Sequence, residues 1–189
     1  MKTNRRIHPA WIAAIVTFFT LVATAGFRSA PSVLIIPLQD AFGWHRDQIS
    51  LAIAINVLLY GLTAPFAAAL MERFTVRKVV MGALITVSTG AFLTTLIQAP
   101  WQLIATWGVI VGVGTGSMAL VFAATVANRW FVKRRGLVVG GLTAAAAMGQ
   151  LIFLPGLTHL SGMYGWKSIG LTIGAAALLM VPMIYVFLR

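Results

Sequence analysis

The chain has 189 residues, of which 60% are hydrophobic and only 9% are charged, and its formal net charge at pH 7 is +11. Because a soluble domain carries about 25% charged residues, this composition excludes a water-soluble globule and predicts an integral membrane protein. It also excludes a nucleic-acid-binding domain, because the basic residues lie in short gaps between apolar runs and not along one soluble face.

Several apolar stretches are long enough to cross a membrane, since a transmembrane helix needs about 20 mainly apolar residues to span about 30 Å of hydrocarbon. The gaps between them are short, and none is long enough for a soluble domain. The sequence therefore predicts an all-α fold, a polytopic membrane protein with six transmembrane helices over residues 11–38, 50–70, 79–97, 103–127, 137–160 and 167–188.

The first span also has features of a secretory signal, with a basic start, an apolar centre and small residues at Ala23, Ala25 and Ala30. However, the apolar run resumes after Arg28 and continues to Leu38, which makes it too long for a signal core. We therefore expect an uncleaved first helix.

The basic residues set the expected orientation, because cytoplasmic connections hold the excess of Lys and Arg. Eleven of them lie on one side of the predicted topology, in the N-terminal segment, the second and fourth connections and the C-terminus. Only Arg46 and Lys167 lie on the other side. The sequence thus predicts a multi-pass protein of the cell inner membrane with both termini in the cytoplasm.

Three glycines on the fourth span, Gly108, Gly112 and Gly116, are spaced by four residues and share one helix face. Helices in lipid associate through close backbone approach at small residues. The spacing predicts a packing face, although glycine is also simply common in membrane helices.

The connection after the second span, residues 68–80, has the sequence AALMERFTVRKVV. It resembles the loop signature G-x-L-x-D-R-x-G-R-R-x-x-L of the major facilitator superfamily. Glu72 stands where the acid belongs, and Arg73, Arg77 and Lys78 supply basic residues, whereas both glycines and one basic residue are replaced. The resemblance implies that this loop acts as a conformational latch through these four residues.

Two further segments, FGWHRDQIS at residues 42–50 and NRWFVKRRGL at residues 128–137, are similar to the monocarboxylate and oxalate–formate branch of that superfamily. In the fourth span, Gly112 and Gly114 resemble the family's R-x-x-x-G-x-G region, with Gly108 in the position of the arginine. The resemblance implies the N-terminal six-helix half of a twelve-helix transporter, built as a three-plus-three inverted repeat. A C-terminal six-helix half is then missing from this chain.

Arg28 is the only ionisable side chain well inside a predicted span. Placing it there costs at least about 2.5–3.5 kcal/mol, so a compensating interaction is required. Our hypothesis is that Arg28 faces a water-filled cavity and binds the carboxylate of an anionic substrate through its forked donors. The alternative is that it extends to the membrane interface or serves packing. Weaker candidates for the substrate site, whose polar groups also suit hydrogen bonds between helices, are Thr24, Asn56, Tyr60, Thr115 and Gln150.

These features predict secondary active or facilitated transport of a small solute, an organic anion such as a monocarboxylate, by alternating access. Two alternatives stay open: efflux of drugs or hydrophobic metabolites by the same fold, and a non-transporting membrane scaffold or half-bundle assembly partner. We expect no enzyme, cofactor or metal site, because the sequence holds no nucleophile–base pair, phosphate-binding loop or metal-ligand set. The predicted partners are a small anionic substrate, the lipid bilayer and the missing half, and not nucleic acid.

Overall fold

The computed structural model describes residues 9–118, 120–130 and 135–187, which form helices joined by short connections. Several basic residues used for the orientation, namely Lys2, Arg5, Arg6, Lys133, Arg134 and Arg189, lie outside the described residues. The elements are α1 (Pro9–Phe42), α2 (Arg46–Arg73), α3 (Val76–Thr94), α4 (Pro100–Leu103), the π-helix η1 (Ile104–Val111), α5 (Gly112–Gly116), α6 (Leu120–Trp130), α7 (Arg135–Tyr164) and α8 (Lys167–Phe187).

Five of the described helices are long and apolar enough to cross a membrane, which confirms the membrane class predicted from composition. They coincide with the first, second, third, fifth and sixth predicted spans, although α1, α2 and α7 continue past both predicted ends. Gly43 and Gly165 end α1 and α7 with positive φ angles of 67° and 79°. Their N–H groups donate to the carbonyls of Gln39 and Ser161, a helix ending that glycine adopts without a side-chain clash.

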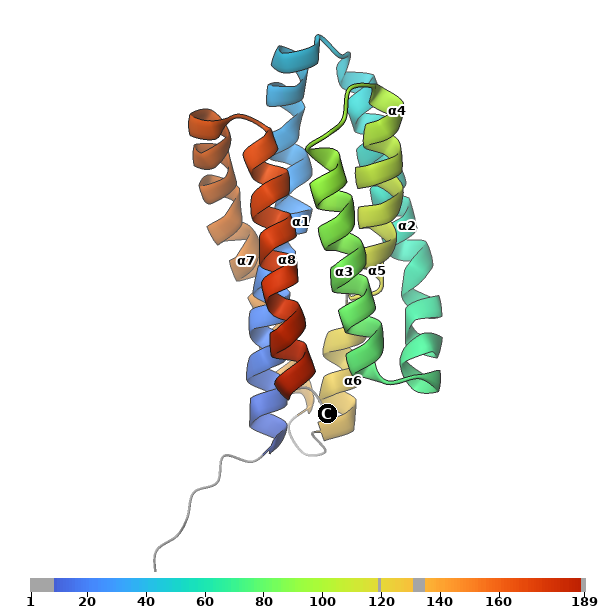
Figure 1. Cartoon of the computed structure of the whole chain (residues 1–189). Coiled ribbons are helices and arrows are strands. Elements are labelled where there is room, and N and C mark those ends of the chain that lie inside the picture. The colour runs from blue at the N-terminus through green and yellow to red at the C-terminus, as the bar shows by residue number, and fades with distance from the viewer. Residues whose placement is uncertain (1–8, 119, 131–134, 188–189) are drawn as a thin grey trace, which may run out of the picture.

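The fourth predicted span differs from a single continuous helix. It runs through α4, η1 and α5, turns at Ser117 and Met118, and resumes as α6. Four glycines between residues 108 and 116 weaken regular helix here, since each costs about 1 kcal/mol relative to alanine in a helix interior. These segments nevertheless follow one another along the bundle beside α3, and α6 lies near the opposite end from α4 (Figure 1).

The connections alternate between the two ends of the bundle, as the predicted topology requires. The α2–α3 connection, with Arg73, Arg77 and Lys78, lies at the same end as the start of α1 and the end of α8 (Figure 1). The α1–α2, α3–α4 and α7–α8 connections lie at the other end (Figure 1). The described basic residues of the second connection therefore share one end with both described chain ends.

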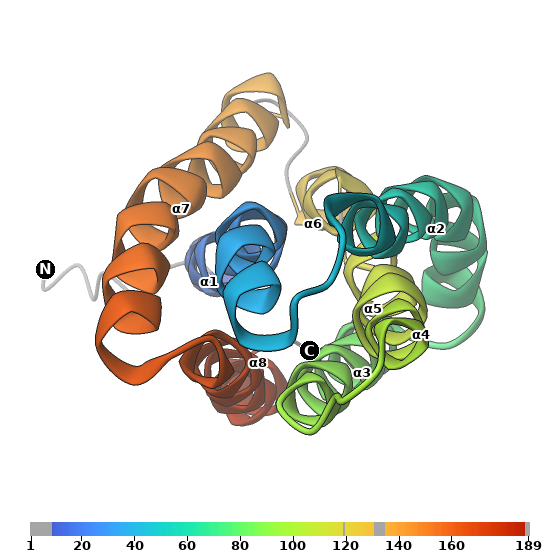
Figure 2. The same ribbon diagram turned by 90° about the horizontal axis from the view of Figure 1, so that it is seen from above.

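The main helix contacts each join one of the first three spans to one of the last three. α1 packs on α7, α2 packs on η1 and α5, and α3 packs on α8, as the end-on view shows (Figure 2). In an inverted repeat, the first, second and third spans correspond to the fourth, fifth and sixth. This correspondence turns the α1–α7 pair into the pair of α2 with η1 and α5, and it turns the α3–α8 pair into itself. The packing thus has the symmetry of the expected three-plus-three repeat.

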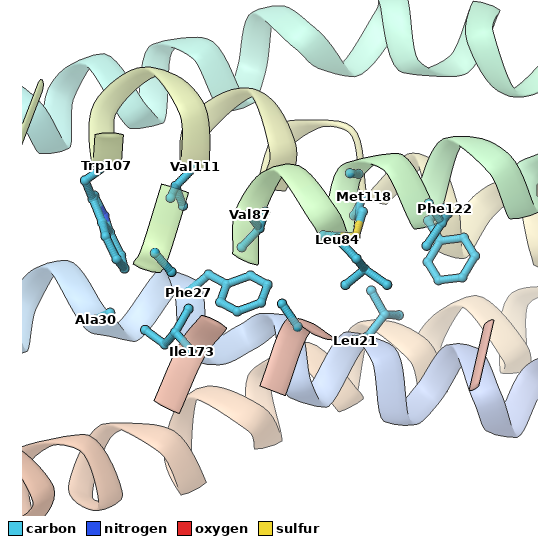
Figure 3. Packing of buried hydrophobic residues seen from close by; sticks show 14 of the residues in the cluster. Leu21, Phe27, Ala30, Leu84, Val87, Trp107, Val111, Met118, Phe122 and Ile173 are labelled. Carbon is cyan, nitrogen blue, oxygen red and sulfur yellow. The ribbon is translucent and has the colours of Figure 1, made fainter. Parts of the chain in front are cut away.

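Buried apolar side chains fill the middle of the bundle between α1, α3, η1 and α8, with Phe27, Val87, Trp107 and Ile173 among them (Figure 3). In contrast, α2 and α7 turn large apolar side chains outward. Phe66 is 66% exposed and Leu151 is 76% exposed. An apolar outer surface of this kind fits lipid or a second apolar bundle, not water.

Three aromatic side chains join two connections at one end of the bundle. The Phe42 ring stacks on Trp44 with centroids 4.6 Å apart, and its centroid lies 5.4 Å from that of Trp166. Such aromatic pairs contribute about 0.5–1.5 kcal/mol beyond area burial. They hold the end of α1 beside the α7–α8 connection, and so help to fix the position of α1 in the bundle.

Candidate functional site

Arg28 projects from α1 towards α2, where its guanidinium lies over the ring of Tyr60 with Cζ 4.9 Å from the ring centroid. Tyr60 lies near the middle of α2 (Arg46–Arg73), so the charge is level with the middle of that helix. A cation–π contact of this kind contributes about 0.5–2 kcal/mol. A charge near the centre of a transmembrane helix costs about 2.5–3.5 kcal/mol, so the contact compensates only part of the cost of placing Arg28 there.

A cavity of about 460 Å³ adjoins Arg28, in a space where α1 and α2 make little direct contact. Its apolar walls include Phe27 and Ile53, and Ser32 adds a hydroxyl. Five of the six candidate substrate residues line it, namely Arg28, Asn56, Tyr60, Thr115 and Gln150.

The sixth candidate, Thr24, lines a smaller cavity of about 50 Å³ on the other side of Arg28. Arg28, Tyr60 and Thr115 line this cavity too, together with Thr143 of α7. The structure therefore brings all six candidates around one guanidinium, from α1, α2, α5 and α7. Their role in binding a substrate stays a prediction.

Hydrogen bonds divide the candidates into engaged and available donors. The hydroxyl of Thr24 donates to the carbonyl of Leu21 (3.1 Å), and that of Thr115 donates to the carbonyl of Val111 (2.9 Å). Among the described residues, the side-chain donors of Arg28, Tyr60 and Gln150 have no such bond. An anion needs donors, and those that remain for it in this cavity come from these three residues and from the second amide hydrogen of Asn56, whose Nδ2 makes one hydrogen bond.

Asn56 makes the hydrogen bond between helices that the sequence analysis gave as the alternative to a substrate contact, although the sequence did not identify its partner. Its side-chain Nδ2 donates to the backbone carbonyl of Trp107 at 2.7 Å. Trp107 lies inside the π-helix η1, where the hydrogen-bond register differs from that of an α-helix. The bond therefore fixes η1 against α2, and Asn56 Oδ1 remains an acceptor at the cavity.

The predicted packing face of the fourth span is confirmed. A Cβ added at Gly108 would lie 3.1 Å from a carbonyl oxygen of α2, and one added at Gly112 would lie 3.1 Å from the Cα of Asn56. At Gly116 it would lie 2.8 Å from the carbonyl oxygen of Tyr60. The three glycines thus allow η1 and α5 to approach α2 closely, which places Thr115 beside Tyr60 at the cavities.

The latch candidates lie at the end of the bundle away from the α1–α2 connection. Glu72, Arg73 and Lys78 are exposed, whereas Arg77 is half-buried. The guanidinium of Arg77 donates to the carbonyl of Tyr185 in the last turn of α8 (3.4 Å) and lies over the Tyr185 ring at 4.9 Å. The loop is thereby joined to α8, a contact that connects residues 108 positions apart in the sequence.

Sequence reasoning missed the Arg28–Tyr60 contact and the apolar walls of the larger cavity. Helical spacing gives a partial signal for the walls, since Phe27, Pro31 and Ile35 follow one another at intervals of four, and so do Ile53 and Val57. No such signal exists for the contact, because it joins two helices. Among the described residues, no group of three His, Asp or Glu lies close enough to hold a metal ion.

Residues 14–189 match the family model described as Major Facilitator Superfamily. The chain is 29% identical over 157 residues to monocarboxylate transporter 7 of Homo sapiens, which covers 83% of this chain and 30% of that protein. It is 26% identical over 168 residues to the uncharacterized MFS-type transporter YcxA of Bacillus subtilis (strain 168), covering 89% and 41%.

Similarity to monocarboxylate transporter 9 of Mus musculus extends over 174 residues at 29% identity, covering 89% of this chain and 33% of that protein. The chain therefore spans about a third of the length of the curated relatives that it matches.

Proposed function

The chain belongs to the Major Facilitator Superfamily, and we propose that it is the N-terminal six-helix bundle of a transporter for a small organic anion. The chain is a multi-pass membrane protein, which we place in the inner membrane with both termini in the cytoplasm. The anion moves by alternating access, the rocking of two bundles about a site near the membrane centre. The observation that carries this proposal is Arg28, a positive charge level with the middle of α2 and beside a cavity of about 460 Å³.

The chemistry of the cavity wall supports an anionic substrate. Arg28 is the charged residue among those that line the cavity, so a carboxylate there meets one guanidinium and no competing acid. A guanidinium binds a carboxylate through two parallel N–H donors, an arrangement stronger than a neutral hydrogen bond. Because Tyr60 covers one face of the guanidinium, the edge donors remain for the anion.

The apolar walls of the cavity and the names of the relatives indicate which kind of organic anion is the substrate. Ile35 and Ile53 suit a short hydrocarbon part next to the carboxylate. Two of the relatives compared above bear the name monocarboxylate transporter. We therefore assign a monocarboxylate as the substrate class. The same apolar walls also suit efflux of a hydrophobic compound, which is the second candidate.

An uptake assay separates these candidates. Proteoliposomes that contain the chain together with its second bundle, purified from native membranes, are expected to take up labelled acetate and pyruvate with saturation, because both carry one carboxylate. Neutral glucose is not expected to enter above the rate of protein-free liposomes. Saturable transport of a lipophilic cation such as tetraphenylphosphonium, without uptake of either acid, would contradict the anion assignment and favour efflux.

A second six-helix bundle is needed to close the site. The exposed apolar side chains of α2 and α7, such as Phe66 and Leu151, provide a surface for it. The mass of the native protein in membranes, detected with an antibody to the N-terminal segment, shows where the second bundle comes from. A species of about twice 20.2 kDa carries both bundles in one chain, whereas a species of 20.2 kDa requires a separate partner or a second copy. A lone 20.2 kDa chain without a bound bundle would contradict this part of the proposal.

We also propose that the α2–α3 connection acts as the latch, with Arg77 as its contact to α8. Arg77→Gln removes the cation above Tyr185, so we expect the initial uptake rate to change by about threefold, the equivalent of an exposed cation–π contact. The comparison is with Arg46→Gln, which loses the same charge at the other end of α2. Equal uptake by the two variants and the native chain would remove Arg77 from the latch.

A further inference from the structure

Two cavities meet at Arg28, and they lie towards opposite ends of the bundle. The larger one includes Ser32 of α1 and Ile53 of α2, which lie on the side of the α1–α2 connection. The smaller one includes Thr24 of α1 and Ala123 of α6, which lie towards the other end. A solute that crosses the bundle beside Arg28 has to pass from one space into the other.

Three residues line both cavities, namely Arg28, Tyr60 and Thr115, so they form the partition. Thr115 is only 7% exposed, and its hydroxyl donates to carbonyls of its own helix. The part of the partition that is able to move is therefore the contact between the guanidinium and the ring.

The two sides of that contact differ in freedom. A Cβ added at Gly116 would lie 2.8 Å from the carbonyl oxygen and 2.9 Å from the Cα of Tyr60, so the α2 backbone here rests directly on α5. Arg28 is exposed and reaches the ring through a flexible side chain. Separation of the two spaces thus depends on whether the guanidinium stays on the ring.

We infer that the Arg28–Tyr60 contact is a gate that closes the smaller cavity, and that Tyr60 is a positioning residue for Arg28. The ring holds one face of the guanidinium and leaves the edge donors free for an anion in the larger cavity. When Arg28 leaves the ring, the two cavities join and the bound anion gains a path towards the smaller one. This inference rests on the proposed function for the identity of the solute, but not for the existence of the gate.

The gate is tested by thiol accessibility, for which the chain is well suited because it contains no cysteine. Ser32→Cys places a thiol in the larger cavity, and Thr24→Cys places one in the smaller cavity. The probe is membrane-impermeant 2-sulfonatoethyl methanethiosulfonate, added to membranes from the side of the α1–α2 connection. With Tyr60 intact, we expect labelling of Ser32→Cys and protection of Thr24→Cys.

Tyr60→Ala is then combined with each thiol. Thr24→Cys is expected to become labelled at a rate comparable to that of Ser32→Cys, because the ring that separates the cavities is gone. Tyr60→Phe retains the ring and is expected to restore protection, since the cation–π contact does not need the hydroxyl. Unchanged labelling of Ser32→Cys in the Tyr60→Ala chain shows that the bundle is still folded.

Arg28→Ala removes the other partner and serves as the second variant if Tyr60→Ala disturbs folding. Labelling of Thr24→Cys as fast as Ser32→Cys with Tyr60 intact would overturn the gate. So would continued protection of Thr24→Cys in both Tyr60→Ala and Arg28→Ala. None of these measurements uses a carboxylate substrate or a transport rate, so a failed gate leaves the uptake prediction standing, and a failed uptake prediction leaves the gate standing.

Discussion

Replacement of Arg28 with alanine is expected to lower kcat/KM for carboxylate uptake by about 100- to 1,000-fold, the usual cost of removing one partner of a hydrogen-bonded charge pair that binding buries. The cavity offers no second cation that is able to take over, since the remaining residues that line it are uncharged. Arg28→Lys keeps the charge but loses the fork, so we expect a loss of about tenfold, equivalent to one hydrogen bond to a charged group. The measurement is the initial rate of labelled pyruvate uptake against concentration.

Two controls separate loss of substrate binding from a general effect of the substitution. Lys167→Ala removes an exposed cation at the end of the bundle near Trp166 and is expected to transport at the native rate. The amount of each variant in the membrane is measured beside the rate, so that loss of protein is not mistaken for loss of binding. Native uptake of every accepted acid by both Arg28→Ala and Arg28→Lys would end the assignment of Arg28 to the substrate.

Gly149→Ala is expected to destabilise the folded bundle by about 1–3 kcal/mol, the range for forcing an extra methyl into a well-packed interface. A Cβ at this position of α7 would lie 2.6 Å from the carbonyl oxygen of Val22 and 2.5 Å from the Cβ of Ala25 on α1. A backbone carbonyl cannot rotate away as a side chain does, so α1 and α7 have to move apart. The midpoint of unfolding in detergent, followed by tryptophan fluorescence, measures the change.

Gly140→Ala is the matched control on the same helix. A Cβ there would meet nothing within 4 Å, so the variant is expected to be neutral or more stable by up to about 1 kcal/mol through helix propensity. Because α1 also carries Arg28, Gly149→Ala is expected to weaken uptake in parallel with stability. Equal unfolding midpoints for the two variants would show that α1 and α7 leave room for a methyl group at residue 149, and would contradict the close contact between them.

The membrane class, the positions of the helices and the exceptional place of Arg28 all follow from the sequence. Transfer into lipid is a property of each stretch of about 20 residues, so a local reading of hydropathy suffices to find the spans. The same holds for a single charge within an apolar run, which is costly wherever the helix lies in the membrane. The glycine spacing on the fourth span also predicts a packing face, because it depends only on helix geometry.

Only the tertiary structure decided which faces meet. That α1 packs on α7, that the Arg28 guanidinium lies over Tyr60, and that Asn56 donates to Trp107 depend on how distant helices cross and in what register. Local hydropathy carries no information on either quantity, because all faces of these helices are apolar enough for lipid. The π-helix at η1 likewise depends on its contacts with α2, and the partition between the two cavities exists only once α1, α2 and α5 are assembled.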